Sequence, residues 1–108
     1  MPMEHENCPC METCPLNRAM ALIGGKWKMQ ILCSLYNNGP TRYNQLKKTL
    51  DGVSNTVLAN ALRELEGDGL VHRREVLEVP VRVEYAITEP CRQLIPILDA
   101  LGDWSMAL

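Results

Sequence analysis

The sequence predicts a single, mainly helical domain that carries one small β-hairpin near its C-terminal end, an α+β fold. Hydrophobic residues recur at helical spacing over most of the chain, and glycine, proline and asparagine breaks divide this pattern into short helices. Over residues 82–88 the helical spacing gives way to an alternation of positions that is typical of a half-buried β-strand. With 108 residues, of which 46% are hydrophobic and 22% charged, the chain can bury a core and lacks the composition of a disordered protein.

Three short helices are expected in the first half of the chain. Pro15 suits the first position of a helix, where its missing N–H costs nothing, and Gly24-Gly25 ends that helix. A second helix is expected over about residues 26–36 and a third over about residues 43–50, with an Asn-Asn-Gly-Pro break between them. Residues 1–13 show no hydrophobic period and are expected to form a flexible, cysteine-containing arm.

A helix-turn-helix is predicted at about residues 43–66. Asp51-Gly52 supplies the turn, and Ser54 is a good N-cap for a helix that reaches about residue 66. The apolar stripe of this helix is expected to be Val57, Leu58, Ala61, Leu62 and Leu65.

A β-hairpin, or wing, is predicted at about residues 70–88. Val83, Tyr85 and Ile87 alternate with their neighbours, residues 70–77 are the expected partner strand, and Pro80 suits the tip because no ladder donor is needed there. The helical period returns over about residues 89–106. The predicted architecture over residues 14–108 is therefore a winged helix-turn-helix with one helix added after the wing.

The charged residues are unevenly distributed. The net charge is -2, yet residues 15–50 contain six basic residues and no acidic one, whereas residues 51–108 contain ten acidic and five basic residues. A basic segment on an acidic chain is expected for a local phosphate-binding face, and a solvated helix surface is the alternative reading.

Four separated motifs resemble the HxlR-type transcriptional regulators, a MarR-like family. They are Ile23-Gly24-Gly25-Lys26-Trp27, Gly39-Pro40-x-Arg42-Tyr43-x-x-Leu46, Leu62-Arg63-Glu64-Leu65-Glu66-x-Asp68-Gly69-Leu70-Val71 and Val83-Glu84-Tyr85-x-Ile87-Thr88. The resemblance covers about residues 14–104. This sequence departs from the family pattern at Pro90-Cys91 and in the additional Cys8 and Cys10 of the arm.

The resemblance implies a homodimeric repressor or activator whose first and last helices form the dimer interface. The residues expected there are Leu16, Met20, Leu94, Leu98, Leu101 and Trp104. The expected partner is double-stranded DNA with a palindromic or inverted-repeat operator, because a two-fold symmetric dimer reads two half-sites.

The second helix of a helix-turn-helix enters the major groove, so its polar face is expected to contact bases. That face contains Asn55, Thr56, Ala59, Asn60 and Arg63. A merely solvated face is the alternative, and for Arg63 an internal ion pair with Glu64 or Glu66.

Phosphate contacts are expected from basic side chains around this face. The candidates are Lys26, Arg42, Lys47, Lys48 and Arg73. Arg82, beside the tip of the wing, is expected either to enter a minor groove or to contact a phosphate. Of Arg73 and Arg74, one is expected to face DNA and the other a carboxylate. Ser54 is expected to act mainly as a helix cap, although it can also donate to a phosphate.

Cys14 is the candidate redox-sensing residue. It stands at the expected N-cap of the first helix, where the helix dipole and Arg18 favour a thiolate, and exposure on the arm would make it reactive. The resemblance implies a response to oxidants, electrophiles or aldehydes at this position; an unreactive thiol is the alternative. Cys33 is expected in the core, and Cys91 is either a second reactive thiol or a partner for Cys14 across the dimer. Cys8 and Cys10 of the arm are further candidate redox-sensing residues.

Two other regulatory modes stay open. His5, Cys8, Cys10 and Cys14 form a weak candidate zinc or soft-metal site, although the spacing matches no standard zinc finger; no other cofactor is expected. A metal-responsive regulator and a winged-helix protein-interaction module without DNA binding are therefore the competing functions.

Enzymatic and membrane functions are not expected. The sequence shows neither a nucleophile–base–acid set nor a glycine-rich phosphate loop after a strand. The acidic N-terminus does not resemble a signal peptide, and no apolar run approaches the roughly 20 residues that span a bilayer. A cytoplasmic protein is expected, in which five cysteines do not form a disulfide scaffold.

Overall fold

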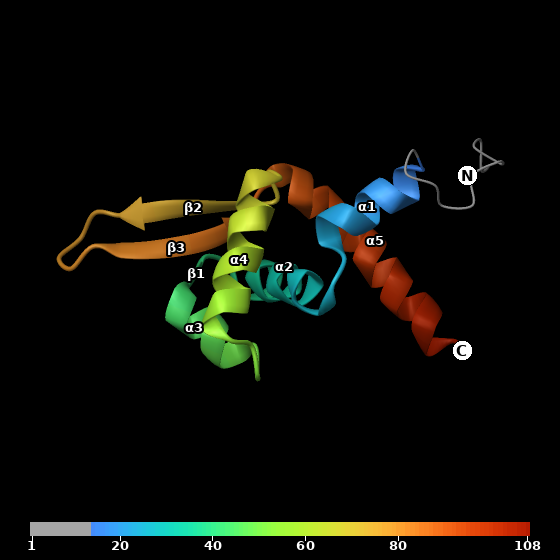
Figure 1. Ribbon diagram of the computed structural model, residues 1–108, viewed down its shortest axis with the longest axis horizontal. Coiled ribbons are helices and arrows are strands. Elements are labelled where there is room, and N and C mark those ends of the chain that lie inside the picture. Colours follow the sequence, from blue (N-terminus) through green and yellow to red (C-terminus); the bar gives the residue numbers. More distant parts are fainter. Residues whose placement is uncertain (1–13) are drawn as a thin grey trace.

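A computed structural model describes residues 14–108, which form five helices and one small antiparallel sheet whose hairpin projects from one end of the domain (Figure 1). The elements follow the order α1 (Pro15–Ile23), α2 (Lys26–Asn38), β1 (Thr41–Arg42), α3 (Tyr43–Thr49), α4 (Asn55–Gly67), β2 (Val71–Val76), β3 (Arg82–Ile87) and α5 (Glu89–Met106). The predicted helix-turn-helix corresponds to α3 and α4, and the predicted wing to β2 and β3. The expected winged helix-turn-helix fold is confirmed.

The sheet has the strand order β1-β3-β2 and is antiparallel throughout. In the hairpin, Val71 pairs with Ile87 at the base and Val76 with Arg82 towards the tip. The short strand β1 pairs Thr41 with Tyr85 and was not predicted, because two residues cannot show an alternating pattern. It ties the chain before α3 to the wing.

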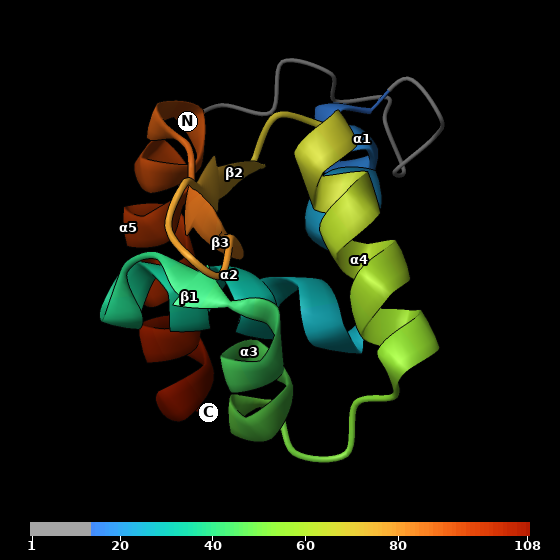
Figure 2. The same ribbon diagram turned by 90° about the vertical axis from the view of Figure 1, so that its left-hand side faces the viewer.

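Helix α2 occupies the centre of the domain. Viewed along the wing, it lies between α4 on one side and α5 on the other (Figure 2). Its Ile31, Leu32 and Leu35 are at most 1% exposed. They belong to one buried cluster that also contains Leu46, Leu58, Leu62, Leu65, Val71, Ile87 and Cys91. The helix-turn-helix, the wing and the start of α5 are therefore anchored on the same core.

Two burial predictions were wrong. Val57 is 41% exposed, so the buried stripe of α4 is narrower than expected and consists of Leu58, Ala61, Leu62 and Leu65. Cys33 is exposed and does not belong to the core. It directly follows Leu32, and the next helical position turns away from the α4 side of α2.

The two ends of the described chain lie away from the wing. Helix α5 runs from the base of the wing to the opposite end of the molecule (Figure 1). Within residues 14–108 no helix is both long and apolar enough to cross a membrane.

Candidate DNA-binding interface

The start of α4 is held in place by two side chains. Ser54 caps the helix, its hydroxyl accepting a hydrogen bond from the Val57 amide at 3.1 Å, as predicted. The Tyr43 hydroxyl of α3 lies 3.1 Å from the Asn55 carbonyl and 3.2 Å from Asn55 Oδ1. The first turn of α4 is therefore fixed relative to α3.

Lys47 braces the turn between these helices. Its ammonium donates to the Val53 carbonyl at 3.1 Å, and the residue is half-buried. Sequence reasoning assigned Lys47 to phosphate alone. Because an ammonium has three donors, Lys47 can still donate to a phosphate while it is bonded to Val53. The phosphate contact of Lys47 therefore stays a prediction.

The polar face of α4 is exposed as predicted. Asn55, Thr56, Asn60 and Arg63 are exposed, and Ala59 is half-buried. Arg63 Nη1 donates to Asn60 Oδ1 at 2.9 Å rather than pairing with the neighbouring carboxylates. The face therefore presents amides, a hydroxyl and a guanidinium, the groups that hydrogen-bond to base edges and phosphates.

Glu64 is turned towards α2, away from the wing. Its carboxylate lies 2.7 Å from Lys28 Nζ, and the hydrogen bond and positive charge of Lys28 lower the pKa of Glu64. Because Glu64 pairs with Lys28, it does not form the ion pair with Arg63 that was considered as an alternative.

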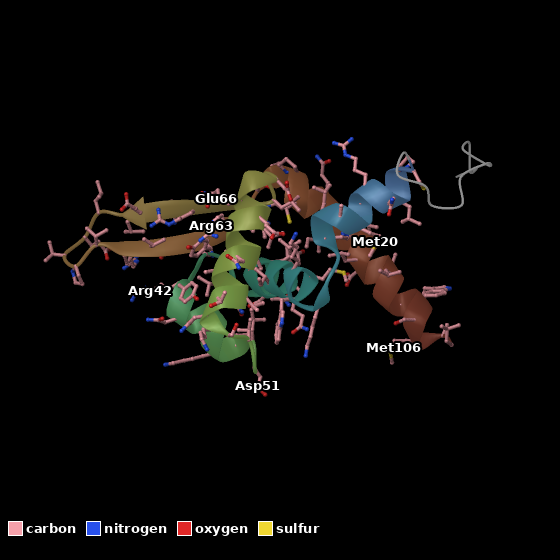
Figure 3. The ribbon with its side chains drawn as sticks, viewed as in Figure 1. Met20, Arg42, Asp51, Arg63, Glu66 and Met106 are labelled. Carbon is pink, nitrogen blue, oxygen red and sulfur yellow. The ribbon has the colours of Figure 1, made fainter. Side chains whose placement is uncertain are left out.

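A hollow of about 290 Å³ separates α4 from the wing. Its lining residues are Tyr43, Ala59, Leu62, Arg63, Glu66, Arg73 and Tyr85. Two arginines from different elements, Arg63 and Arg73, therefore border one concave surface, together with Glu66. Figure 3 shows Arg63 on α4 close to the wing strands and Arg42 on the same side of the domain.

Further basic side chains flank this face. Arg42 and Lys48 line a second, open hollow beside α3 with Val83 of the wing. Lys26 lies with its ammonium 4.8 Å from the centroid of the Trp27 ring. It borders a third hollow together with Val57 and Asn60 of α4. The structure thus groups Lys26, Arg42 and Lys48 around the helix-turn-helix.

The other wing arginines are engaged with carboxylates. Arg74 Nη2 lies 3.1 Å from Glu84 Oε1, which confirms that one of the two adjacent arginines meets a carboxylate. Arg82 pairs with both Glu78 and Glu84. An Arg82 contact to DNA stays a prediction, and it would compete with these two ion pairs.

The cysteines differ from the prediction in exposure. Cys14 does precede α1, but it is 1% exposed, so the expected exposed thiol was wrong. Cys91 is fully buried at the start of α5. Burial raises the pKa of its thiol, against the opposing effect of the Arg92 charge, and both the burial and the raised pKa disfavour a reactive Cys91.

The proposed metal ligands of the arm, His5, Cys8 and Cys10, lie outside the described residues. Within residues 14–108 no three His, Cys, Asp or Glu side chains gather to hold a metal ion. A metal on the arm therefore stays untested.

Apart from those at the end of the wing, most exposed large apolar side chains lie on α1 and along α5. Leu16 and Met20 of α1 are about half exposed, as are Leu101 and Trp104 of α5. Ile97 is 63% exposed and continues this stripe at helical spacing, although it was not among the residues expected at the dimer interface. Leu94 and Leu98 instead lie half-buried against the domain's own core.

A braced helix-turn-helix with a polar reading face, flanked by basic side chains and a wing, defines a DNA-binding regulator of the winged-helix class. Residues 22–108 match the HxlR-like helix-turn-helix family. The chain therefore belongs to this family of transcriptional regulators, as the sequence motifs indicated.

Several known proteins are similar to this chain over most of their length. The HTH-type transcriptional regulator YdzF of Bacillus subtilis is 41% identical over 93 residues, which are 86% of this chain and 85% of YdzF. The solved structure of the redox regulator HypR in its oxidized form has a TM-score of 0.80 at 36% identity, covering 88% of this chain and 97% of HypR. The reduced form of YodB from B. subtilis has a TM-score of 0.79 at 32% identity, covering 85% and 90% of the two chains.

Acid is expected to weaken the wing through Glu84. Hydrogen bonding from Arg74 lowers the pKa of Glu84, and Arg82 adds to this effect, while burial opposes it. Because the folded pKa lies below the unfolded value, the stabilisation is complete above about pH 4.5 and disappears as pH falls through the folded pKa. Thermal melts should show wild type more stable than Glu84→Gln at pH 7, with the difference shrinking below pH 4.5. An unchanged difference at low pH would contradict this assignment.

Proposed function

We propose that the protein is a homodimeric, sequence-specific regulator of transcription that acts in the cytoplasm and changes its operator affinity when Cys14 is modified. The observation that carries the DNA-binding part is the concave surface between α4 and the wing, bordered by Arg63 and Arg73 next to an exposed polar helix face. The sensing part rests on the position of Cys14 at the start of α1.

In the proposed complex, α4 enters the major groove. A helix with its side chains is about 10–12 Å across and the groove is about 12 Å wide. The sugar–phosphate strand that borders the groove then runs through the hollow between α4 and the wing, which Arg63 and Arg73 line. Lys26, Arg42 and Lys48 contact phosphates on either side, whereas Asn55, Thr56 and Asn60 face base edges.

Dimerisation follows from the apolar surface of α1 and α5. Leu16 and Met20 on α1, and Ile97, Leu101 and Trp104 on α5, leave apolar surface in water in one chain. Covering these stripes with a second copy removes that surface from water. A symmetric dimer then places two α4 helices about 34–36 Å apart, which matches an inverted repeat of half-sites.

The proposed switch acts through α1. Ile23 is the buried residue of this helix, whereas Leu16 and Met20 face outward into the proposed dimer interface. A disulfide or adduct at Cys14 cannot be accommodated in a site that is 1% exposed unless the start of α1 shifts. Such a shift changes the dimer geometry and therefore the spacing of the two α4 helices.

The solved relatives support this proposal. HypR is described as a redox regulator and was solved in oxidized and reduced forms. YodB was solved in a reduced form and after treatment with diamide. These descriptions concern those proteins, and the present proposal extends thiol switching to Cys14 of this chain.

The phosphate contact of Arg73 can be tested against its neighbour. Arg73→Gln should weaken binding to every duplex alike and reduce the slope of log K against log salt by about 0.9, the value for one lost phosphate contact. Arg74→Gln is the matched control, because Arg74 is engaged with Glu84 and should change the slope much less. Fluorescence anisotropy over a salt series measures both. Equal salt slopes for Arg73→Gln and wild type would contradict the Arg73 contact, and the absence of salt-dependent affinity for any duplex in wild type would contradict the DNA-binding function.

The dimer interface can be tested at Ile97. Ile97→Asp should convert the dimer to a folded monomer and lower operator affinity, because the charge is buried without a partner only in the dimer. Ile97→Leu, an apolar replacement of equal volume, should remain dimeric. Analytical ultracentrifugation with circular dichroism distinguishes dissociation from unfolding, and a dimeric Ile97→Asp variant would refute this interface.

The thiol switch can be tested by exchanging two cysteines in turn. Diamide should change the operator affinity of wild type and of Cys33→Ser, but not that of Cys14→Ser, in a gel-shift titration. Because Cys14 is buried and Cys33 exposed, a thiol-alkylating reagent should label Cys33 faster. A response that survives in Cys14→Ser and is lost in Cys33→Ser would assign the sensor to α2 instead.

A further inference from the structure

The tip of the wing is apolar and almost entirely in solvent. Leu77 is 85% exposed, Val79 102% and Val81 55%, and Pro80 lies between the two valines. These residues, 77–81, form the apolar wing tip. The exposed fractions of Leu77 and Val79 exceed those of Ile97 and Trp104 in the proposed dimer interface, and the wing lies at the other end of the molecule (Figure 1).

The hairpin is long enough to reach the groove next to the one that α4 would enter. Each of its strands has six residues, and at about 3.3 Å per residue they extend roughly 20 Å from the base. On B-DNA the adjacent minor groove lies about half a helical turn away, roughly 17 Å. Figure 1 shows the hairpin projecting beyond α3 and α4.

The arginines near the tip are poorly placed to act as a cationic clamp. Arg82 is paired with Glu78 and Glu84, and Arg74 with Glu84, so two guanidinium groups face two carboxylates. The positive charge available to a phosphate lies further back, at Arg73, beside the hollow. The chemistry that the tip offers to a surface in front of it is therefore apolar contact.

Proteins that bind the minor groove insert such apolar side chains, leucine and proline among them, between base steps and bend the duplex. The tip is continuous with the proposed DNA interface, because the wing strands that carry it also supply Arg73 and Tyr85 to the hollow beside α4. This continuity favours DNA over a separate protein partner.

We propose that the apolar wing tip seats Leu77 and Val79 in the minor groove beside each half-site and partly unstacks one base step there. The paired arginines Arg74 and Arg82 stiffen the hairpin behind the tip. Flexible pyrimidine–purine steps, such as TA and CA, should then be preferred at that position, because they unstack at least cost. This inference rests on the proposed DNA-binding function.

The test compares tip variants on a duplex selected by the wild-type protein from a random pool. 2-Aminopurine replaces one base at a time in the minor-groove segment on the wing side, because its fluorescence rises when it unstacks. Wild type should raise the fluorescence at one step. Leu77→Ser combined with Val79→Ser should abolish the rise and weaken binding about ten-fold, the cost of losing one base-pair contact, with an unchanged salt slope.

Matched controls separate the outcomes. Leu77→Met combined with Val79→Ile keeps the tip apolar and should retain the fluorescence rise. Both side chains of the tip are exposed, so the melting temperature should be the same in all variants. Three results would each overturn the proposal. The serine variant could match wild type in affinity and fluorescence, or the wild-type complex could show no fluorescence rise. The third is a loss of affinity in the serine variant that comes with a smaller salt slope. Absence of duplex binding by wild type would refute the DNA-binding function itself.

Discussion

The structure depends on the burial of α2. Ile31, Leu32 and Leu35 are almost completely removed from water, and they contact the cluster to which α3, α4, the wing and α5 each contribute. Burying such aliphatic side chains contributes roughly 1.5–3 kcal/mol each, so this helix supplies the common base for the whole domain. The reading face of α4 and the outer stripe of α5 are positioned through it, on opposite sides.

This arrangement gives the proposed switch a physical route. Helices α1 and α5, proposed to form the dimer, and α4, proposed to contact bases, each contribute to a core centred on α2. In the proposed dimer, a shift of α1 would therefore change the spacing of the two α4 helices without unfolding either domain. The bonds from Tyr43 to Asn55 and from Lys47 to Val53 keep each helix-turn-helix rigid. If operator affinity is controlled by half-site spacing, the DNA-binding unit must be rigid and the dimer interface must be able to move.

The wing combines two different chemistries along one hairpin. Near its base, Arg73 and Tyr85 border the hollow beside α4. Further out, Arg74, Arg82, Glu78 and Glu84 neutralise one another, and beyond them the tip is apolar. In the proposed complex, the base of the wing would offer the positive charge of Arg73 to a phosphate strand. The tip would offer apolar contact to the floor of the groove.

The sequence by itself determined the order of elements, the helix-turn-helix, the wing and the Ser54 cap, because hydrophobic periodicity, breakers and capping are local properties of the chain. Family motifs added the class of protein. Only the tertiary structure decided the pairing of β1 with β3, the burial of Cys14 and the exposure of Cys33 and Val57. It also decided which arginines meet carboxylates and which side of α5 faces outward. These properties depend on which distant segment lies opposite each residue, and that information is absent from the local pattern.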